Sequence, residues 1–281
     1  MTSPSAVASL LRRHDRDRYL TALFAPGDRR EALMALYAFN FEVARTREIV
    51  TEPLLGQIRL QWWRESLQAA YAGGLVRRHE VVEPLTAAIR THGLSREHFE
   101  RLLEARALDL ADAPPATLAE LEAYCEGTSS RLLWLALEIL GVRADAAAIT
   151  AARETGIAYA LAGLLRAIPF HASARRQYIP AELAAAVGLD PAALFALEPT
   201  PALRKAVAAL AAEAARHLAA ARRHAREVPG RALPALLPGR LAESALKRIA
   251  RAGHDVFDPR LEAPSLGRNL GLAWSALRGR Y

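Results

Sequence analysis

Two segments of the chain, residues 33–48 and 160–180, combine arginines with aromatic side chains, a mixture that suits the binding of a phosphate group. Their candidate binding residues are Tyr37, Phe41, Arg45, Glu48, Arg166, His171, Arg176 and Tyr178. Arginine binds phosphate directly through paired hydrogen bonds, whereas magnesium usually requires one or two carboxylates beside the substrate phosphates. The second segment contains no aspartate or glutamate. We therefore assign neither a metal ligand nor a catalytic residue, and direct binding of a phosphate by arginine stays open.

The signals for helix ends place both segments on helices. Asp28 followed by Glu31 is a capping-box pattern, which predicts a helix from there to about Val50. The second segment begins in a long helix predicted over about 145–167, which should stop before Pro169. The first set of candidate residues is thus expected within a helix, and the second at the end of a helix and in the loop after it.

The rest of the sequence also favours helix, because alanine is abundant while β-branched and aromatic residues are sparse. Thr117 and Glu120 form a second capping pair. Further helices are predicted over about 53–73, 81–91, 95–111, 117–140, 181–187, 191–196, 201–227 and 239–252, before a tail rich in proline and glycine. No strand-like alternation, linker or repeat interrupts this pattern, so we expect one all-α domain over residues 1–281.

The composition limits the possible partners. The formal net charge is +7 and the sequence pI about 10.0, which suits nucleic acid, anionic lipid or a diphosphate. We expect no nucleic-acid binding, because zinc-type Cys/His spacing and basic-aromatic RNA motifs are missing.

Cys125 is the single cysteine, which fits a reducing cytoplasm. No apolar run approaches the ~20 residues of a membrane span. We expect a cytoplasmic protein, or one held peripherally on the inner membrane.

Residues 33–48 resemble a signature stretch of the squalene/phytoene synthase family, whose members join two isoprenoid diphosphates head to head. That family carries its magnesium ions on two Asp-rich motifs, and the first reads Asp-Asp-x-x-Asp. Here Ala44 and Arg45 stand at the first two aspartates and Glu48 at the third, while Phe41 replaces a family arginine. The resemblance implies a loss of Lewis-acid help to the leaving diphosphate, which is usually worth several kcal/mol.

Residues 160–180 resemble the second motif, Asn-x-x-Arg-Asp-x-x-x-Asp, and the Arg-Gly-Arg-x-Tyr-Leu-Pro that follows it. The two agree at Arg166, Arg176, Tyr178 and Pro180. Gly163 stands at the asparagine, and Ala167 and His171 stand at the aspartates. Across both motifs four of the five aspartates are absent and the fifth is glutamate. The resemblance therefore implies the family's frame without most of its metal ligands.

The resemblance extends over most of the chain, including an acidic turn at residues 108–110. Its alignment is ambiguous over residues 121–130. The family's Tyr-Cys-x-x-Val-Ala-Gly-Thr can be placed on Tyr124-Cys125 or on Gly127-Thr128, and the second choice puts Leu121 where a functional tyrosine belongs.

From the resemblance we expect the all-α isoprenoid synthase fold, a single-domain helical bundle around a central cavity. The missing aspartates resemble a branch of the family without coupling activity, which includes eukaryotic proteins that assist the assembly of mitochondrial respiratory complex I. We therefore expect a non-catalytic protein without a cofactor. The implied partners are an isoprenoid or other lipid, a protein in respiratory-complex assembly, and a peripheral membrane surface.

Two alternatives stay open at the level of the sequence. One is an active prenyltransferase that makes squalene, phytoene or a hopanoid precursor from farnesyl or geranylgeranyl diphosphate with magnesium. The other binds a prenyl diphosphate without metal and without turnover. Individual residues also have simpler interpretations: Tyr37 and Phe41 as plain core, His171 as a surface or hydrogen-bonding residue, and Arg45 as the internal partner of Glu42 or Glu48.

Overall fold

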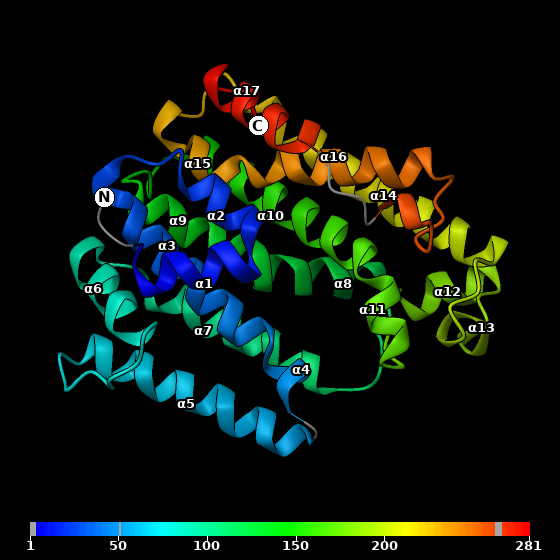
Figure 1. The fold of residues 1–281 in the computed structure, drawn as a ribbon, viewed down its shortest axis with the longest axis horizontal. Helices are drawn as coiled ribbons and strands as arrows, with labels where there is room; N and C mark the ends of the chain where they lie inside the picture. The colour runs from blue at the N-terminus through cyan, green and yellow to red at the C-terminus, as the bar shows by residue number, and fades with distance from the viewer. Residues whose placement is uncertain (1–3, 51, 262–265) are drawn as a thin grey trace.

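The computed structural model describes residues 4–50, 52–261 and 266–281, and every regular element among them is helical. In chain order the α-helices are α1 Ala6–His14, α2 Arg16–Ala22, α3 Gly27–Ala44, α4 Thr46–Ile49, α5 Pro53–Tyr71, α6 Val82–His92, α7 Arg96–Ala107, α8 Leu118–Cys125, α9 Arg131–Ile139, α10 Ala146–Arg166, α11 Ile168–Ser173, α12 Ala181–Val187, α13 Pro191–Phe195, α14 Pro201–Arg223, α15 Leu233–Leu236, α16 Pro238–Arg251 and α17 Leu266–Leu277. The expected all-α architecture is confirmed (Figure 1).

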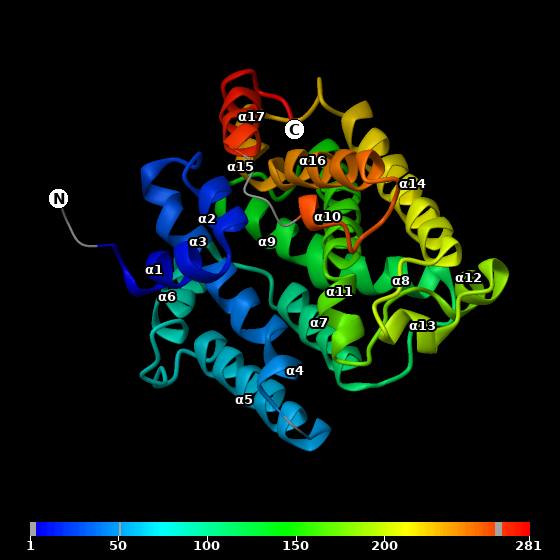
Figure 2. The ribbon, with the colours of Figure 1, turned by 45° about the vertical axis from the view of Figure 1, so that its right-hand side comes forward.

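Helix α10 lies in the middle of the molecule, where it packs against α8, α9, α14 and α16 (Figures 1 and 2). It also contacts a π-helical segment, Glu126–Ser130, that joins α8 to α9. Gly156 makes that contact possible, because a Cβ atom at this position would lie 2.5 Å from the Cα of Ser130. The long central helix thus brings the two halves of the chain together.

Two large hydrophobic cores flank this central helix. The first unites side chains of α1, α3, α5, α6, α7 and α9, and the second unites those of α8, α10–α14 and α16. In the first core, Phe39 packs edge-on against Trp63 and Phe99, with ring centroids 5.1 and 5.3 Å apart. Tyr37 and Phe39 are fully buried there.

The structure tests two predicted helix caps, Thr117 and Asp28. Thr117 caps α8 as predicted, since its side chain accepts a 3.2 Å hydrogen bond from the backbone N–H of Glu120. The capping role predicted for Asp28 is wrong. The extended backbone of Pro26 begins α3 one residue earlier, so Asp28 lies inside the first turn, where its charge suits the helix dipole.

Three other predictions about helices differ from the structure. The helix expected to reach Val50 is divided at Arg45 into α3 and α4, and the helix expected over 117–140 contains the π-helical segment. The tail predicted without helix carries α17. Among the described residues, no helix combines the length and the hydropathy that a membrane span requires.

Candidate functional site

A buried carboxylate, Asp109, gathers polar side chains from three separate segments of the chain. It lies just after α7 and is 5% exposed. Its Oδ1 accepts hydrogen bonds from the hydroxyls of Tyr124 and Tyr178, both at 2.7 Å. Its Oδ2 lies 3.1 Å from Nη1 of Arg106, which also donates to the Tyr124 hydroxyl at 2.9 Å. With Arg176 and His171, these residues form what we name the Asp109 cluster.

The second signature segment enters the Asp109 cluster through the turn after α11. Arg175 adopts a positive φ of 55°, which reverses the chain so that the next residues face α7. Nη2 of Arg176 then donates to the backbone carbonyl of Asp109 at 2.5 Å. The His171 ring lies on Tyr178, with centroids 4.8 Å apart. Burial, together with the positive charge of Arg176, lowers the pKa of His171 to about 4, which keeps the imidazole neutral near pH 7.

In the Asp109 cluster the carboxylate and Tyr124 are buried, and an apolar cavity adjoins Tyr178 and Arg176. Burial raises the pKa of both Tyr124 and Tyr178 well above the usual range, so that the phenols remain neutral donors to the carboxylate. Beside Tyr178 and Arg176 lies an apolar cavity of about 20 Å³, partly walled by Leu121. A space of this size holds about one water molecule. The cluster is therefore a packed polar junction with no room for a diphosphate.

The first signature segment forms a separate ion-pair group around Glu42. Nη1 of Arg45 lies 3.4 Å from one carboxylate oxygen of Glu42, and Nη2 of Arg59 lies 2.5 Å from the other. The Arg45 guanidinium also covers the ring of Phe41 at 5.2 Å, and Phe41 stacks on His14 at the same distance. Arg45 thus has an anionic partner within the structure, Glu42, as its simpler interpretation expects.

The other residues of this segment lie apart from that group. Glu48 is exposed, and Arg47 pairs with Asp112 at 3.5 Å. Tyr37 is buried against Arg18, and its hydroxyl has no hydrogen-bond partner within the described residues. Burial raises the pKa of Tyr37 to about 12. Tyr37 is thus part of the core, next to a buried guanidinium.

A large cleft of about 1060 Å³ opens between the start of α2, the end of α10, α11 and α16. Arg166 and Ala167 of the second signature segment lie on its wall, with Gly163 one helical turn earlier. The apolar part of the wall consists of Phe170, Leu197, Leu241, Ala245, Ile249, Val256, Phe257 and Leu261. This is the volume of a typical small-molecule site, and it is large enough for a lipid.

Every aspartate on the wall of this cleft is engaged by an arginine. The ion pairs are Asp15 with Arg18 at 3.0 Å, Asp17 with Arg166 at 3.4 Å, and Asp258 with Arg260 at 2.5 Å. Magnesium needs carboxylates that can turn toward a shared ion. In the structure each carboxylate of the cleft wall is paired with a cation, which a magnesium ion would have to displace.

The positions at which the family carries its aspartates do not fit magnesium in this chain. Ala167 offers no donor atom, and Arg45 presents a cation. The His171 ring contacts Tyr178 at a tilt, and Glu48 faces solvent as a single carboxylate. This donor set lacks the hard oxygen ligands that magnesium requires.

The structure therefore distributes the candidate residues over five places. His171, Arg176 and Tyr178 meet in the Asp109 cluster, and Arg166 lies on the cleft. Phe41 and Arg45 belong to the Glu42 group, Tyr37 is core, and Glu48 is exposed. Sequence reasoning missed Arg106 and Tyr124 as members of the cluster. The spacing of Arg106 and Asp109, three residues apart at a helix end, was a usable signal.

Comparisons with known proteins agree with this architecture. The family model described as squalene/phytoene synthase matches residues 11–267. NADH dehydrogenase (ubiquinone) complex I, assembly factor 6, of Mus musculus is 33% identical over 97% of this chain and 81% of its own length. Presqualene diphosphate synthase of Rhodopseudomonas palustris is 29% identical over 72% of each chain. The crystal structure of a squalene synthase from Alicyclobacillus acidocaldarius superposes with a TM-score of 0.77 at 25% identity, covering 89% of this chain and 93% of that one. The fold is the all-α isoprenoid synthase fold, and the chain belongs to the squalene/phytoene synthase family.

Proposed function

We propose that this chain is a non-catalytic member of its family that binds an isoprenoid or other prenyl lipid in the cleft and acts in the assembly of a respiratory complex. One observation carries the proposal. Each aspartate of the cleft wall is paired with an arginine, and Ala167 stands on that wall at a family aspartate. The cleft thus keeps the volume for a substrate-like ligand and lacks a pair of carboxylates to share metal ions.

The cleft is lined by both apolar and charged side chains, which suits an amphiphilic ligand. Its apolar wall, which includes Phe170, Ile249 and Phe257, suits a prenyl chain. Arg16 also lines the cleft; it is exposed and has no ion-pair partner in the part of the chain that the structure describes. An anionic or strongly polar head group next to Arg16 would supply the partner that this arginine lacks.

The assembly role rests on the relatives. Proteins named as complex I assembly factor 6 match this chain over nearly its whole length, at 33% identity in Mus musculus. Their similarity supports a protein partner in respiratory-complex assembly, and hence work at the surface of the membrane that holds the complex. A cytoplasmic location with peripheral contact to the inner membrane follows from the same proposal.

Ligand binding can be tested by titrating farnesyl diphosphate and farnesol into the purified protein, with magnesium or with EDTA. We expect binding that is unchanged by EDTA. Gly163→Phe should fill the cleft, because no atom lies within 4 Å of a Cβ built there, and weaken binding at least ~10-fold. Thr150→Phe, on the exposed outer face of the same helix, is the matched control and should bind normally. Binding that requires magnesium, or that survives Gly163→Phe, would contradict the proposed site.

The assembly role has its own test in the host that carries this gene. Deleting the gene should lower the NADH:ubiquinone oxidoreductase activity of isolated membranes, and wild-type protein should restore it. Unchanged activity and unchanged amounts of the assembled complex would rule the role out.

The active prenyltransferase remains the second candidate, since presqualene diphosphate synthase of Rhodopseudomonas palustris is 29% identical over 72% of this chain. It requires carboxylates that are released from their arginines when substrate and magnesium enter. Magnesium-dependent release of pyrophosphate from farnesyl diphosphate distinguishes it from the leading proposal.

A further inference from the structure

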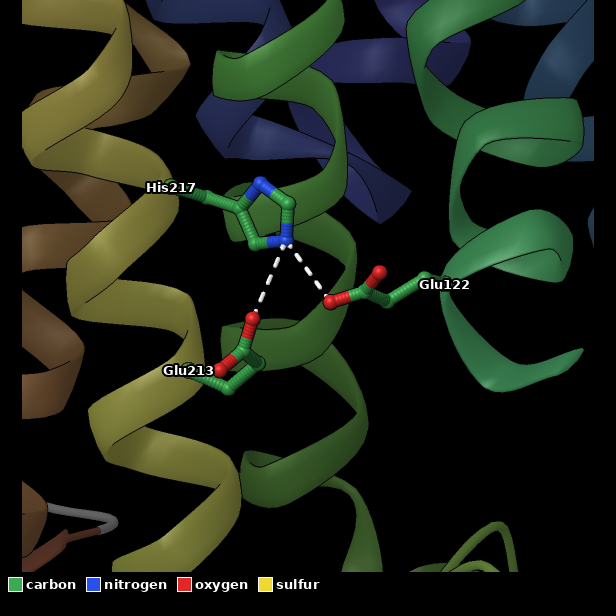
Figure 3. A group of neighbouring side chains, drawn as sticks. All are labelled: Glu122, Glu213 and His217. Carbon is green, nitrogen blue, oxygen red and sulfur yellow. Dashed lines mark hydrogen bonds and ion pairs between the residues drawn. The ribbon is translucent and has the colours of Figure 1, made fainter. Parts of the chain in front are cut away.

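His217 is a buried histidine whose two ring nitrogens face carboxylates on three different helices. It belongs to α14 and is 2% exposed. Its Nδ1 lies 2.7 Å from Oε2 of Glu154 on α10. Its Nε2 lies 3.0 Å from Oε1 of Glu122 on α8 and 3.6 Å from Oε1 of Glu213 on α14. Figure 3 shows Nε2 pointing at these last two carboxylates.

Helix geometry explains why these groups converge. Glu213 and His217 are four residues apart, so they project from the same face of α14. Both α8 and α14 pack against α10, which brings Glu122 opposite that face and Glu154 behind the histidine. The three residues Glu122, Glu213 and His217 come from two helices that otherwise meet mainly through α10.

The spacing of the three ligand atoms matches a small coordination sphere. All three atoms lie within 4.8 Å of one another. Zinc bonds nitrogen and oxygen ligands at about 2.0–2.1 Å in tetrahedral geometry, which puts neighbouring ligand atoms about 3.3–3.4 Å apart. The distances from Nε2 of His217 to the two carboxylates, 3.0 and 3.6 Å, lie on either side of this value. Glu122 and Glu213 are partly exposed, so a water molecule can reach a fourth position.

The hydrogen bond at Nδ1 of His217 is of the kind that metal-binding histidines usually make. Metal-binding histidines almost always donate the N–H of their other nitrogen to a carboxylate, which fixes the ring and its tautomer. Glu154 has this position at Nδ1, and it is itself held by Arg153 at 2.9 Å. A hydrogen bond at Nδ1 directs the lone pair of Nε2 toward Glu122 and Glu213.

Arg216 supplies the positive charge between these groups in the structure. Its Nη2 lies 3.2 Å from Glu122 and 3.0 Å from Nε2 of His217, and it also pairs with Glu213. The Arg216 side chain is 57% exposed, so it can turn into solvent without leaving a buried charge behind. Arg216 therefore competes with any metal ion for the same carboxylates.

We propose that Glu122, Glu213 and His217 form a binding site for a first-row divalent metal ion, with Zn²⁺ the best match, and that the ion displaces Arg216. An imidazole with carboxylates suits zinc, whereas magnesium prefers oxygen ligands alone. The site is separate from the cleft and from both signature segments, and the proposal is independent of the proposed function. A bound ion links α8 directly to α14.

The test is a Zn²⁺ titration of the tag-free protein against a chromophoric chelator, with Co²⁺ absorption as a probe of tetrahedral geometry. We expect one ion per chain. Glu213→Gln and His217→Gln should each weaken binding by ~100-fold, and Glu154→Gln by about 10–100-fold. Arg216→Ala should tighten binding several-fold, because it removes the competing cation.

His224→Gln is the matched control, since His224 lies seven residues further along, at the end of α14, and faces Glu227 at 3.7 Å. It should leave affinity and stoichiometry unchanged. His217 is buried, so its variant is accepted only if circular dichroism shows a folded protein, whereas Glu213 is partly exposed and tests the site without that risk. Absence of zinc binding by folded wild-type protein would overturn the site. Equal losses in His217→Gln and His224→Gln, or weaker binding in Arg216→Ala, would do so as well.

Discussion

The hydroxyl of Tyr178 donates a 2.7 Å hydrogen bond to Oδ1 of Asp109, 69 residues earlier in the chain. The same oxygen accepts an equally short hydrogen bond from Tyr124. This one carboxylate joins the end of α7, helix α8 and the turn after α11. The tyrosine that the second signature segment shares with the family thus belongs to a packed polar junction.

Asp109→Asn should lower the free energy of unfolding by about 3–5 kcal/mol, because it removes the negative charge that compensates Arg106 in a buried environment. Urea denaturation followed by circular dichroism measures this change. Asp112→Asn is the matched control, since Asp112 is 85% exposed and pairs with Arg47 at 3.5 Å. It should cost less than about 1 kcal/mol. Similar losses in the two variants would show that the junction contributes little.

Gly156→Ala should destabilise the protein by at least ~2 kcal/mol, because its Cβ would lie 2.5 Å from backbone and side-chain atoms of Ser130. Gly163 lies on the cleft wall in the same helix, and a Cβ atom there would meet no atom within 4 Å. Gly163→Ala should therefore stabilise α10 by about 0.5–1 kcal/mol. Thermal unfolding of both variants beside wild type tests the pair. If Gly156→Ala raised the melting temperature, the close packing of α10 on the π-helical segment would be refuted.

The stability of the protein should fall in acid partly through His171. Burial and Arg176 lower the pKa of His171 in the folded chain to about 4, against an ordinary value of 6.5. Between these values the unfolded chain binds more protons than the folded one, so stability is lost as the pH falls through this window. The loss attributable to His171 is up to about 3 kcal/mol from pH 7 to pH 4.

Denaturant unfolding of wild type and His171→Gln across pH 4–7 isolates this contribution, because all other titrating groups are shared. As the pH falls, the free energy of unfolding should decrease more for wild type than for His171→Gln. The two curves should therefore converge or cross. Parallel curves across the whole range would mean that His171 titrates normally in the folded protein.

Cys125 should resist thiol reagents in the folded state. It is fully buried, and burial raises the pKa of its thiol well above the ordinary value, so both access and the thiolate fraction are low. Labelling with a chromogenic disulfide reagent near pH 8 should be negligible without denaturant and should reach one thiol per chain in urea. Rapid labelling of the folded protein would indicate that the region around α8 opens easily.

Much of the fold followed from local signals. The long helices predicted over 145–167 and 201–227 are present as α10 and α14, because alanine-rich sequence and clear caps act within one or two turns. Thr117 begins α8 for the same reason. These features depend on residues that are close together in the chain, so they can be predicted without knowledge of the tertiary structure.

What could not be predicted depends on contacts between distant segments. The π-helical segment 126–130 follows the close approach of α10 at Gly156, which no local pattern encodes. The Asp109 cluster joins residues 67 and 69 positions apart, and Glu122 meets His217 across 95 positions. The candidate residues of the two signature segments lie in five different surroundings, which depend on contacts that no local pattern encodes.

The most direct test of the account is an assay of farnesyl and geranylgeranyl diphosphate turnover with magnesium and NADPH, measuring both pyrophosphate and hydrocarbon products. An active presqualene diphosphate synthase in the same assay confirms that products are detectable. We predict no product above background from folded protein, because the aspartates on the cleft wall are paired with arginines and the family's metal-binding positions hold alanine, arginine and histidine. Robust, magnesium-dependent formation of product would contradict the account and identify the chain as a working synthase.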